Sequence, residues 1–308
     1  MTSPTHFVIV YQFGKVASTA LVNTLNRHPD VEAHQSHFLG EDALKRIVVN
    51  ATSPSLSPYF RKHMIGQLMA NLELTTELKR VKTGRDGRKL TVISLSREPV
   101  SWFRSCIQQD IKGYEDGFTR LGQAASPNPE VALQAGVERM LADVSDLLEA
   151  QGGAAAVVNE IGARGGKDFL QRVGTQDEFL KTMLMLSLRP ITWFEEHFRK
   201  CFGFSLEAIP PMGTFWLKQG HPDSYVILRY EDIASEFAAA MQALGVPMKG
   251  KLAEANLSRS KPFAEDIRAA FQSDAANRLR RSLQQTDYAR FFGYEGLETT
   301  NDVAVAAG

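Results

Sequence analysis

Residues 6–19 of the chain read HFVIVYQFGKVAST. The first seven residues form a short apolar run rich in β-branched side chains, which is typical of a parallel strand buried on both faces. The turn FGKVAS then leads into a helix from about Ser18 to Arg27, which Pro29 ends. A strand, a glycine-containing turn and a helix in this order predict the first βα unit of an α/β sheet.

The rest of the chain extends this pattern. Further strands are predicted at 31–36, 90–96 and 224–228, and helices follow them, with a last long helix at about 263–283. We therefore expect an α/β fold with a P-loop-like open parallel sheet flanked by helices. Residues 126–204 show only helical periodicity, which predicts a large helical insertion in a single domain spanning 1–308. The small and polar tail, about 298–308, is predicted to be flexible.

The composition restricts the kinds of partner. Lys plus Arg and Asp plus Glu both number 35 in 308 residues, so no net field draws the chain to nucleic acid or to an anionic membrane. The two cysteines, Cys106 and Cys201, make no disulfide framework and have no zinc spacing. No segment has the ~20 apolar residues of a membrane span, and the N-terminal apolar run is too short for a signal peptide. We expect a cytoplasmic protein in a reducing compartment.

Ligands of open α/β sheets bind at the carboxyl ends of the strands, and the segment after the first strand contains suitable groups. Gly14 opens the turn, Lys15 adds a positive charge, and Ser18 and Thr19 add hydroxyl donors where a helix begins. Such a turn binds phosphate-like anions through backbone N–H groups. The nucleotide-triphosphate loop GxxxxGK[ST] has a second glycine five residues earlier, where this chain has Ile9. The alternative is an ordinary βα turn with Ser18 capping the helix and Lys15 solvated.

A second candidate segment, 96–105, follows the strand at 90–96 and reads SREPVSWFRS. Arg97 leaves the carboxyl end of the strand, and Ser105 lies in the second turn of the helix that Pro99 begins. A forked cation and a hydroxyl are complementary donors for one phosphate. The alternative is that Arg97 pairs with a nearby carboxylate and Ser105 has no role.

The two segments together resemble sulfotransferases that use 3'-phosphoadenosine 5'-phosphosulfate (PAPS). GKVAST is similar to their 5'-phosphosulfate loop, and SREPVSWFRS is similar to their 3'-phosphate motif, with Arg97 and Ser105 at the Arg-x7-Ser spacing. The loop is closer to the AST type of carbohydrate enzymes such as heparan sulfate 2-O-sulfotransferase, and VILRYEDI also fits the superfamily. The pattern GKVAST, HFL and WFEEHFRKCFG is similar to bacterial capsular polysaccharide synthesis proteins.

The resemblance implies the donor site. PAPS would be the cofactor and 3'-phosphoadenosine 5'-phosphate (PAP) the product. The 5'-phosphosulfate would lie on the loop, with Lys15 offsetting the charge on the leaving oxygen. The residues that this assigns to nucleotide binding are Gly14, Lys15, Val16, Ala17, Ser18, Thr19, Arg97 and Ser105. Lys261 or Arg259, in the polar loop before the last predicted helix, would close on the 3'-phosphate or else only begin a solvated helix.

The third segment, His34-Gln35-Ser36-His37, supplies a candidate general base. Enzymes resembling the 2-O-sulfotransferase have a His-x-x-His arrangement after the second strand, and His37 matches its second, catalytic histidine. In an extended segment the two histidines face opposite ways, so only one can reach the site. We favour His37 over His34, with Glu32 as a more distant alternative. Both histidines could instead be polar loop residues, and two histidines alone rarely form a metal site.

The resemblance predicts in-line transfer of a sulfuryl group from PAPS to a hydroxyl acceptor, without a metal. A carbohydrate acceptor follows from analogy alone. Two rival functions remain. One is a kinase-like nucleotide enzyme, against which the missing loop glycine counts. The other is a non-catalytic sulfotransferase-like protein that binds a nucleotide or a glycan.

Overall fold

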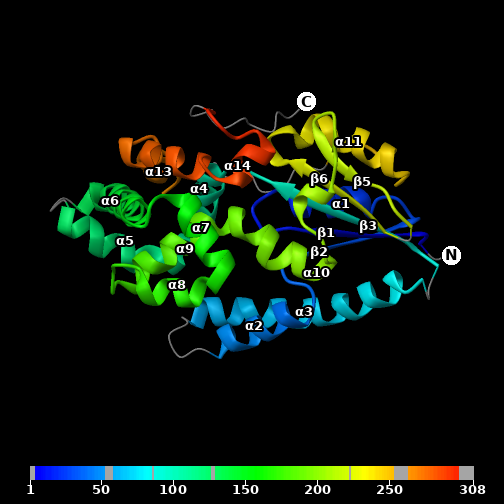
Figure 1. Cartoon of the computed structure of the whole chain (residues 1–308), viewed down its shortest axis with the longest axis horizontal. Coiled ribbons are helices and arrows are strands. Elements are labelled where there is room, and N and C mark those ends of the chain that lie inside the picture. The colour runs from blue at the N-terminus through cyan, green and yellow to red at the C-terminus, as the bar shows by residue number, and fades with distance from the viewer. Residues whose placement is uncertain are drawn as a thin grey trace. The chain divides into compact units, whose positions relative to one another are not determined.

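The structure is a computed structural model, shown in Figure 1. The residues that it describes are 4–52, 58–84, 87–125, 129–221, 223–252 and 263–297. The chain divides into two compact units. We call the described residues up to Ser96 and from Phe194 to 252 the sheet unit, and those from Arg97 to Trp193 and from 263 to 297 the helical unit.

The sheet unit contains one six-stranded sheet with the order β2-β1-β3-β6-β5-β4. Its strands are β1 (His6–Tyr11), β2 (Val31–Ser36), β3 (Lys89–Ser96), β4 (Pro211–Met212), β5 (Phe215–Lys218) and β6 (Asp223–Arg229). The strands β2, β1, β3 and β6 are parallel, whereas β5 and β4 continue the sheet in antiparallel fashion. The predicted open sheet flanked by helices is therefore confirmed, and the sheet is parallel except for β5 and β4. Sequence reasoning missed β4 and β5, which have two and four residues and too little pattern to detect.

The strand β1 occupies the position that matters for ligand binding. It lies between β2 and β3, so the chain leaves β1 toward one edge of the sheet and later returns on its other side. Residues 7–11 are fully buried, as a central parallel strand covered on both faces requires. A reversal of strand order of this kind is where open α/β sheets bind ligands, at the carboxyl ends of the strands.

Helices cover both faces of this sheet. They are α1 (Ser18–Leu25), α2 (Glu41–Ala51), α3 (Pro58–Lys82), the π-helix η1 (Phe194–Arg199), α10 (Lys200–Phe202), the short 3-10 turns η2 (Leu206–Ala208) and η3 (Tyr230–Asp232), and α11 (Ile233–Leu244). Figure 1 shows α3 along one side of the sheet and α11 on the other, with α2 packed beside α3.

The helical unit contains only helices in its described residues. They are α4 (Pro99–Gln109), α5 (Ile111–Ala125), α6 (Pro129–Ala150), α7 (Ala154–Arg164), α8 (Gly166–Arg172), α9 (Glu178–Trp193), α12 (Ala264–Ala270), α13 (Asp274–Gln284) and α14 (Asp287–Phe292). The helices α5 and α6 pack backbone to backbone, because a Cβ on Gly122 would lie only 1.8 Å from the Ala132 carbonyl oxygen.

Two predicted boundaries need comment. The single helix predicted over 263–283 is wrong, because α12 ends at Ala270 and Ser273 begins a new helix, α13. The Ser273 backbone is extended, and its hydroxyl accepts a hydrogen bond from the Ala276 amide at 3.3 Å, which is an N-cap. The helical stretch predicted at 126–204 lies across the two units, with its residues from Phe194 onward in the sheet unit. The predicted tail, 298–308, lies outside the described residues.

In the described part of the chain, no helix combines the length and the apolar composition that crossing a bilayer requires.

Candidate functional site

The loop after β1 has an unusual backbone. Gly14, Lys15 and Ala17 all have positive φ angles, of 92°, 57° and 61°. Glycine adopts such angles without strain, but other residues rarely do. Among the described residues, only Phe263 is another non-glycine residue with positive φ. Held strain of this kind costs of order 1–3 kcal/mol per residue and is concentrated at binding and catalytic sites.

The strained turn leads directly into the N-terminus of α1. Ala17 is the N-cap residue, and no side chain caps the helix. The first intrahelical bond runs from the Leu21 amide to the Ala17 carbonyl at 3.1 Å, so the amides of Ser18, Thr19 and Ala20 precede it. These amides and the helix dipole favour a bound anion. The alternative in which Ser18 caps the helix is therefore wrong, since Ser18 is the first helical residue.

Gln12 forms the base of the loop. Its side chain is completely buried, and its Oε1 accepts a hydrogen bond from the Gly14 amide. Its buried Nε2 has no hydrogen-bond partner among the described residues. An unsatisfied buried donor costs about 1–3 kcal/mol. Gln12 thus brings a buried donor without a partner to the residues that precede the candidate anion loop.

His37 lies against this loop from the segment that follows β2. Its Nδ1 is 2.8 Å from the Gln12 carbonyl oxygen. A carbonyl only accepts, so Nδ1 carries the proton and the lone pair of the neutral ring is on Nε2. A Cβ built on Gly14 would lie 3.8 Å from the His37 Cε1 and 3.9 Å from Nε2. The basic nitrogen of His37 is therefore placed beside the candidate anion loop.

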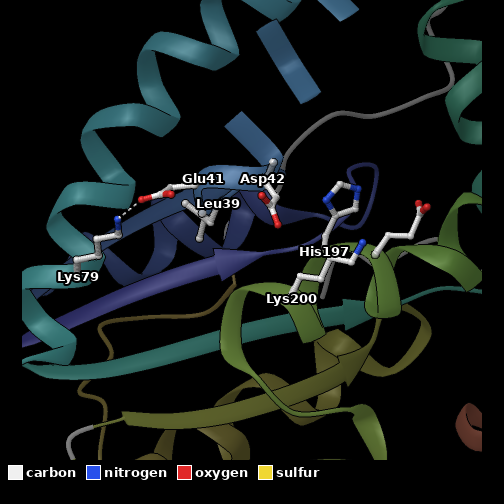
Figure 2. Close-up of a pocket in the computed structure, with 9 residues that line it drawn as sticks. Leu39, Glu41, Asp42, Lys79, His197 and Lys200 are labelled. Atoms are coloured by element: carbon white, nitrogen blue, oxygen red, sulfur yellow. Dashed lines mark hydrogen bonds and ion pairs between the residues drawn. The ribbon is translucent and has the colours of Figure 1, made fainter. Parts of the chain in front are cut away.

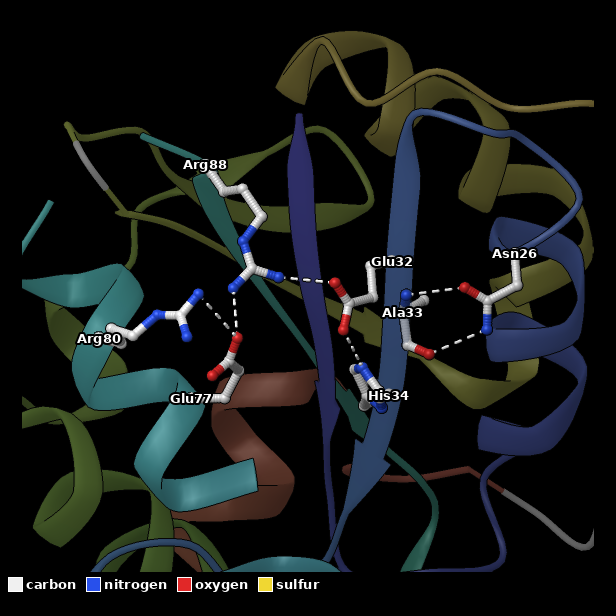
Figure 3. Close-up of polar contacts among 7 residues, drawn as sticks. All are labelled: Asn26, Glu32, Ala33, His34, Glu77, Arg80 and Arg88. Atoms are coloured by element: carbon white, nitrogen blue, oxygen red, sulfur yellow. Dashed lines mark hydrogen bonds and ion pairs between the residues drawn. The ribbon is translucent and has the colours of Figure 1, made fainter. Parts of the chain in front are cut away.

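His34 has a different role. Its Nε2 is 2.9 Å from Glu32 Oε1, and the other Glu32 oxygen accepts from Arg88 at 2.6 Å (Figure 3). Arg88 also donates to Glu77 of α3 at 2.6 Å, and its guanidinium lies 4.7 Å from the Phe7 ring centre. This network fastens α3 to the sheet. It engages both of the alternative bases, His34 and Glu32, in structural contacts.

The hydroxyl groups of the first turn of α1 differ in exposure. Ser18 is buried and Thr19 is exposed, with the Thr19 hydroxyl 3.5 Å from Gln35 Oε1. Both belong to the turn whose amides begin the helix. Together with the half-buried Lys15, they complete a set of N–H, O–H and ammonium donors suited to a tetrahedral oxyanion. The loop therefore fits a phosphate or sulfate group.

Arg97, predicted to bind a second phosphate, lies in the helical unit. Its backbone N–H donates to the Tyr288 hydroxyl at 3.0 Å, and that hydroxyl donates to the Arg97 carbonyl at 3.0 Å. Its side chain is buried and donates to Ser101 Oγ, with Nε at 3.3 Å and one terminal nitrogen at 3.2 Å. Ser105 is one turn further along α4 and partly buried. Ser101 and Ser105 thus lie on one side of α4, and Arg97, just before the helix, contacts the first of them.

The start of α4 already has a carboxylate. The Glu98 side chain is the N-cap and accepts from the Ser101 amide at 2.6 Å. Arg280 of α13 lies near it, with its Nε 3.7 Å from Glu98 Oε1. Burial lowers the pKa of the Arg280 guanidinium, the charge of Arg104 lowers it further, and Glu98 opposes both. Any anion bound here would rely on side-chain cations, because the helix end itself is capped.

Several of these groups were not predicted. Sequence reasoning gave no role to Gln12, Ser101, Arg280 or Tyr288, because their importance depends on contacts between distant segments. Gln12 alone had a local signal, as a polar residue at the end of an apolar strand. Lys261 and Arg259 lie outside the described residues. Among the described residues, no three His, Cys, Asp or Glu side chains are grouped so as to hold a metal ion.

Comparison with protein-family models, with curated proteins and with solved structures found no match to this chain. The candidate site is therefore interpreted from its own geometry.

Proposed function

We propose that this protein is a PAPS-dependent sulfotransferase with a P-loop-like donor loop. One observation carries the proposal: the loop after β1 offers uncapped helix amides and Lys15 to an oxyanion, while His37, oriented by the Gln12 carbonyl, lies against the same loop. An oxyanion site and an oriented base are the two groups that transfer of an anionic group to a hydroxyl requires.

PAPS, when bound, would supply an activated sulfuryl group on a good leaving group. The residues that would hold its 5' end are the amides of 15–19, the hydroxyl groups of Ser18 and Thr19, and Lys15. The buried Gln12 Nε2 and the positive φ angles at Lys15 and Ala17 support this fit, because they are costs that a bound anion can offset.

Two residues of the chain would assist the transfer, one by stabilising negative charge and one by accepting a proton. Lys15 would place an ammonium group where negative charge grows on the departing side. His37 Nε2 would take the proton of the acceptor hydroxyl, since its Nδ1 proton is held by the Gln12 carbonyl. Proton transfer by a placed side chain contributes ~10²–10⁴-fold to such rates. Recognition of the 3'-phosphate by Arg97 and Ser105 is a separate part of the proposal, supported by the buried Arg97 guanidinium and its Ser101 contact.

The assignment of His37 as the base can be tested by measuring the release of PAP from PAPS by chromatography. The reaction is run with water alone and with a pool of saccharides as acceptors. His37→Ala should abolish transfer while its affinity for PAP stays within about twofold of wild type. His34→Ala is the control, because its ring is held by Glu32, and it should retain transfer. A His37→Ala protein with normal turnover would refute the base assignment.

A further inference from the structure

A second feature of the sheet unit is a cavity of about 270 Å³ at the carboxyl end of β2 (Figure 2). This volume is just below the ~300–1,000 Å³ of typical small-molecule pockets, so it suits a ligand of about one ring. Its lining residues are Leu39, Gly40, Glu41, Asp42, Ala43, Lys79, Glu196, His197 and Lys200. None of them belongs to the loop after β1.

One wall of the cavity comes from the connection between β2 and α2. Gly40, with φ of 84°, turns the chain into α2, and its amide is 3.4 Å from Thr75 Oγ1. The side chains of Leu39 and Ala43 are buried and form an apolar floor. The first turn of α2 adds the exposed Glu41 and Asp42.

The opposite wall comes from η1, a π-helix. Such helices are rare and are often found at functional sites. Its Phe194 and Phe198 are buried in the core, and Phe198 stacks on Tyr11 with ring centres 6.5 Å apart. His197 lines the cavity instead and meets the Phe38 ring at 5.3 Å, with the planes at 72°. Phe38 lies 6.4 Å from the His37 ring, so one aromatic residue separates the candidate base from the cavity wall.

The charges that line the cavity have both signs. Figure 2 shows the Glu41–Lys79 pair at one end, His197 and Lys200 at the other, and Asp42 between them. The Lys79 ammonium is 3.1 Å from Glu41 Oε1, and both side chains are mainly exposed. The lining holds three carboxylates, Glu41, Asp42 and Glu196, and two ammonium groups, so its carboxylates exceed its ammonium groups by one.

This lining selects the chemistry of a ligand. Carboxylates accept hydrogen bonds and ammonium groups donate them, and a hydroxyl group can do both. A compact, hydroxyl-rich molecule without charge satisfies both kinds of group at once. A polyanion would be repelled by the excess of carboxylates, because like charges that are brought together are unfavourable.

We infer that this cavity binds an uncharged polyhydroxyl group of about one sugar ring, with Asp42 and Lys200 as its main hydrogen-bonding partners. The inference that the cavity binds a sugar depends only on its lining residues. The inference that this sugar is the sulfuryl acceptor rests on the proposed function. On this inference the acceptor is a neutral saccharide and not a polyanionic chain.

The experiment uses the full chain and a panel of glucose, galactose, N-acetylglucosamine and maltose, with binding followed by ligand-observed NMR. At least one of these sugars should bind, and Asp42→Ala and Lys200→Ala should each weaken it at least tenfold. The matched controls are Glu73→Ala and Lys62→Ala, which remove one exposed charge of each sign from α3 outside the lining. They should bind as wild type does, and heparin should not displace the sugar.

Three results would overturn the inference: no sugar of the panel binds, the cavity variants bind as tightly as wild type, or heparin displaces the sugar. Urea unfolding of the two cavity variants, expected to match wild type because both side chains are exposed, excludes a folding defect. Titration with PAP separates this inference from the proposed function. If sugar binding depends on Asp42 and PAP does not bind, the cavity inference stands and the proposed sulfotransferase function is refuted. If PAP binds and no sugar binds, the proposed function stands and the cavity inference is refuted.

Discussion

Replacing Gly14 by Ala tests whether the loop after β1 needs its unusual backbone. The φ angle of Gly14 is 92°, and a new Cβ would be 3.8 Å from the His37 ring, which is ordinary contact. The cost is therefore conformational and not steric. Placing an L-residue in left-handed backbone costs ~1–2 kcal/mol, and the loss of chain entropy in the unfolded state returns ~0.4–1 kcal/mol. We expect Gly14→Ala to lower the free energy of unfolding by about 0.8 kcal/mol, the difference between the midpoints of these two ranges.

Gly66→Ala is the matched control in the same unit. Gly66 is exposed in α3, does not have positive φ, and a new Cβ there would meet nothing within 4 Å. Alanine is favoured over glycine inside a helix by ~0.5–1 kcal/mol, so Gly66→Ala should stabilise the protein. Both variants are compared with wild type by urea unfolding. A Gly14→Ala protein as stable as wild type would refute the assigned loop conformation, whatever the control does.

Three further predictions concern other contacts. Arg88→Met should lower the free energy of unfolding in urea by roughly 1–2 kcal/mol, because the Arg88 side chain is nearly buried and contacts two carboxylates. Arg80 is exposed, so Arg80→Met should lower it by less than ~0.5 kcal/mol. Equal losses of stability in the two variants would contradict this prediction. Burial raises the pKa of the Cys201 thiol to about 12. The rate of its alkylation, followed by mass spectrometry, should therefore be low at pH 8 and increase about tenfold per pH unit up to pH 11, because only the thiolate reacts. A rate independent of pH would refute this prediction. Tyr288→Phe should destabilise the protein by ~1–3 kcal/mol in the same urea assay, because the Arg97 amide loses its buried acceptor; unchanged stability would show that this contact is dispensable.

The parts of the fold that could be predicted are those with strong local patterns. The strands β1 and β3 are apolar runs, and Pro99 marked the start of α4, since its ring suits the first turn of a helix. The strands β4 and β5 could not be predicted, because β5 is defined by its pairing with β6 and β4 by its pairing with β5. The division into two units also lacks a local signal, because α12, α13 and α14 belong to one unit with α4 to α9, whereas the residues between them, from Phe194 to 252, belong to the sheet unit.

The candidate site divides in the same way. Residues of the loop were predicted because a glycine, a lysine and two hydroxyl residues follow a strand directly. The sequence left two histidines, His34 and His37, as candidates for the base. In the structure His37 contacts the Gln12 carbonyl beside the loop, whereas His34 contacts the Glu32 carboxylate. Neither contact could be predicted from the residue pattern. The cavity beside η1 had no signal at all, because a π-helix depends on hydrogen bonding that the residue pattern does not specify.

The proposed function requires that the loop after β1 binds the nucleotide of a sulfuryl donor. The most direct measurement is calorimetric titration of the full chain with PAP, set against ADP and ATP·Mg²⁺, on wild type, Lys15→Ala and Arg97→Ala. We expect PAP to bind wild type at least tenfold more tightly than ADP or ATP·Mg²⁺ does, and each substitution to weaken the binding of PAP. Binding of ATP·Mg²⁺ with no response to PAP would contradict the proposed function and favour the kinase-like alternative.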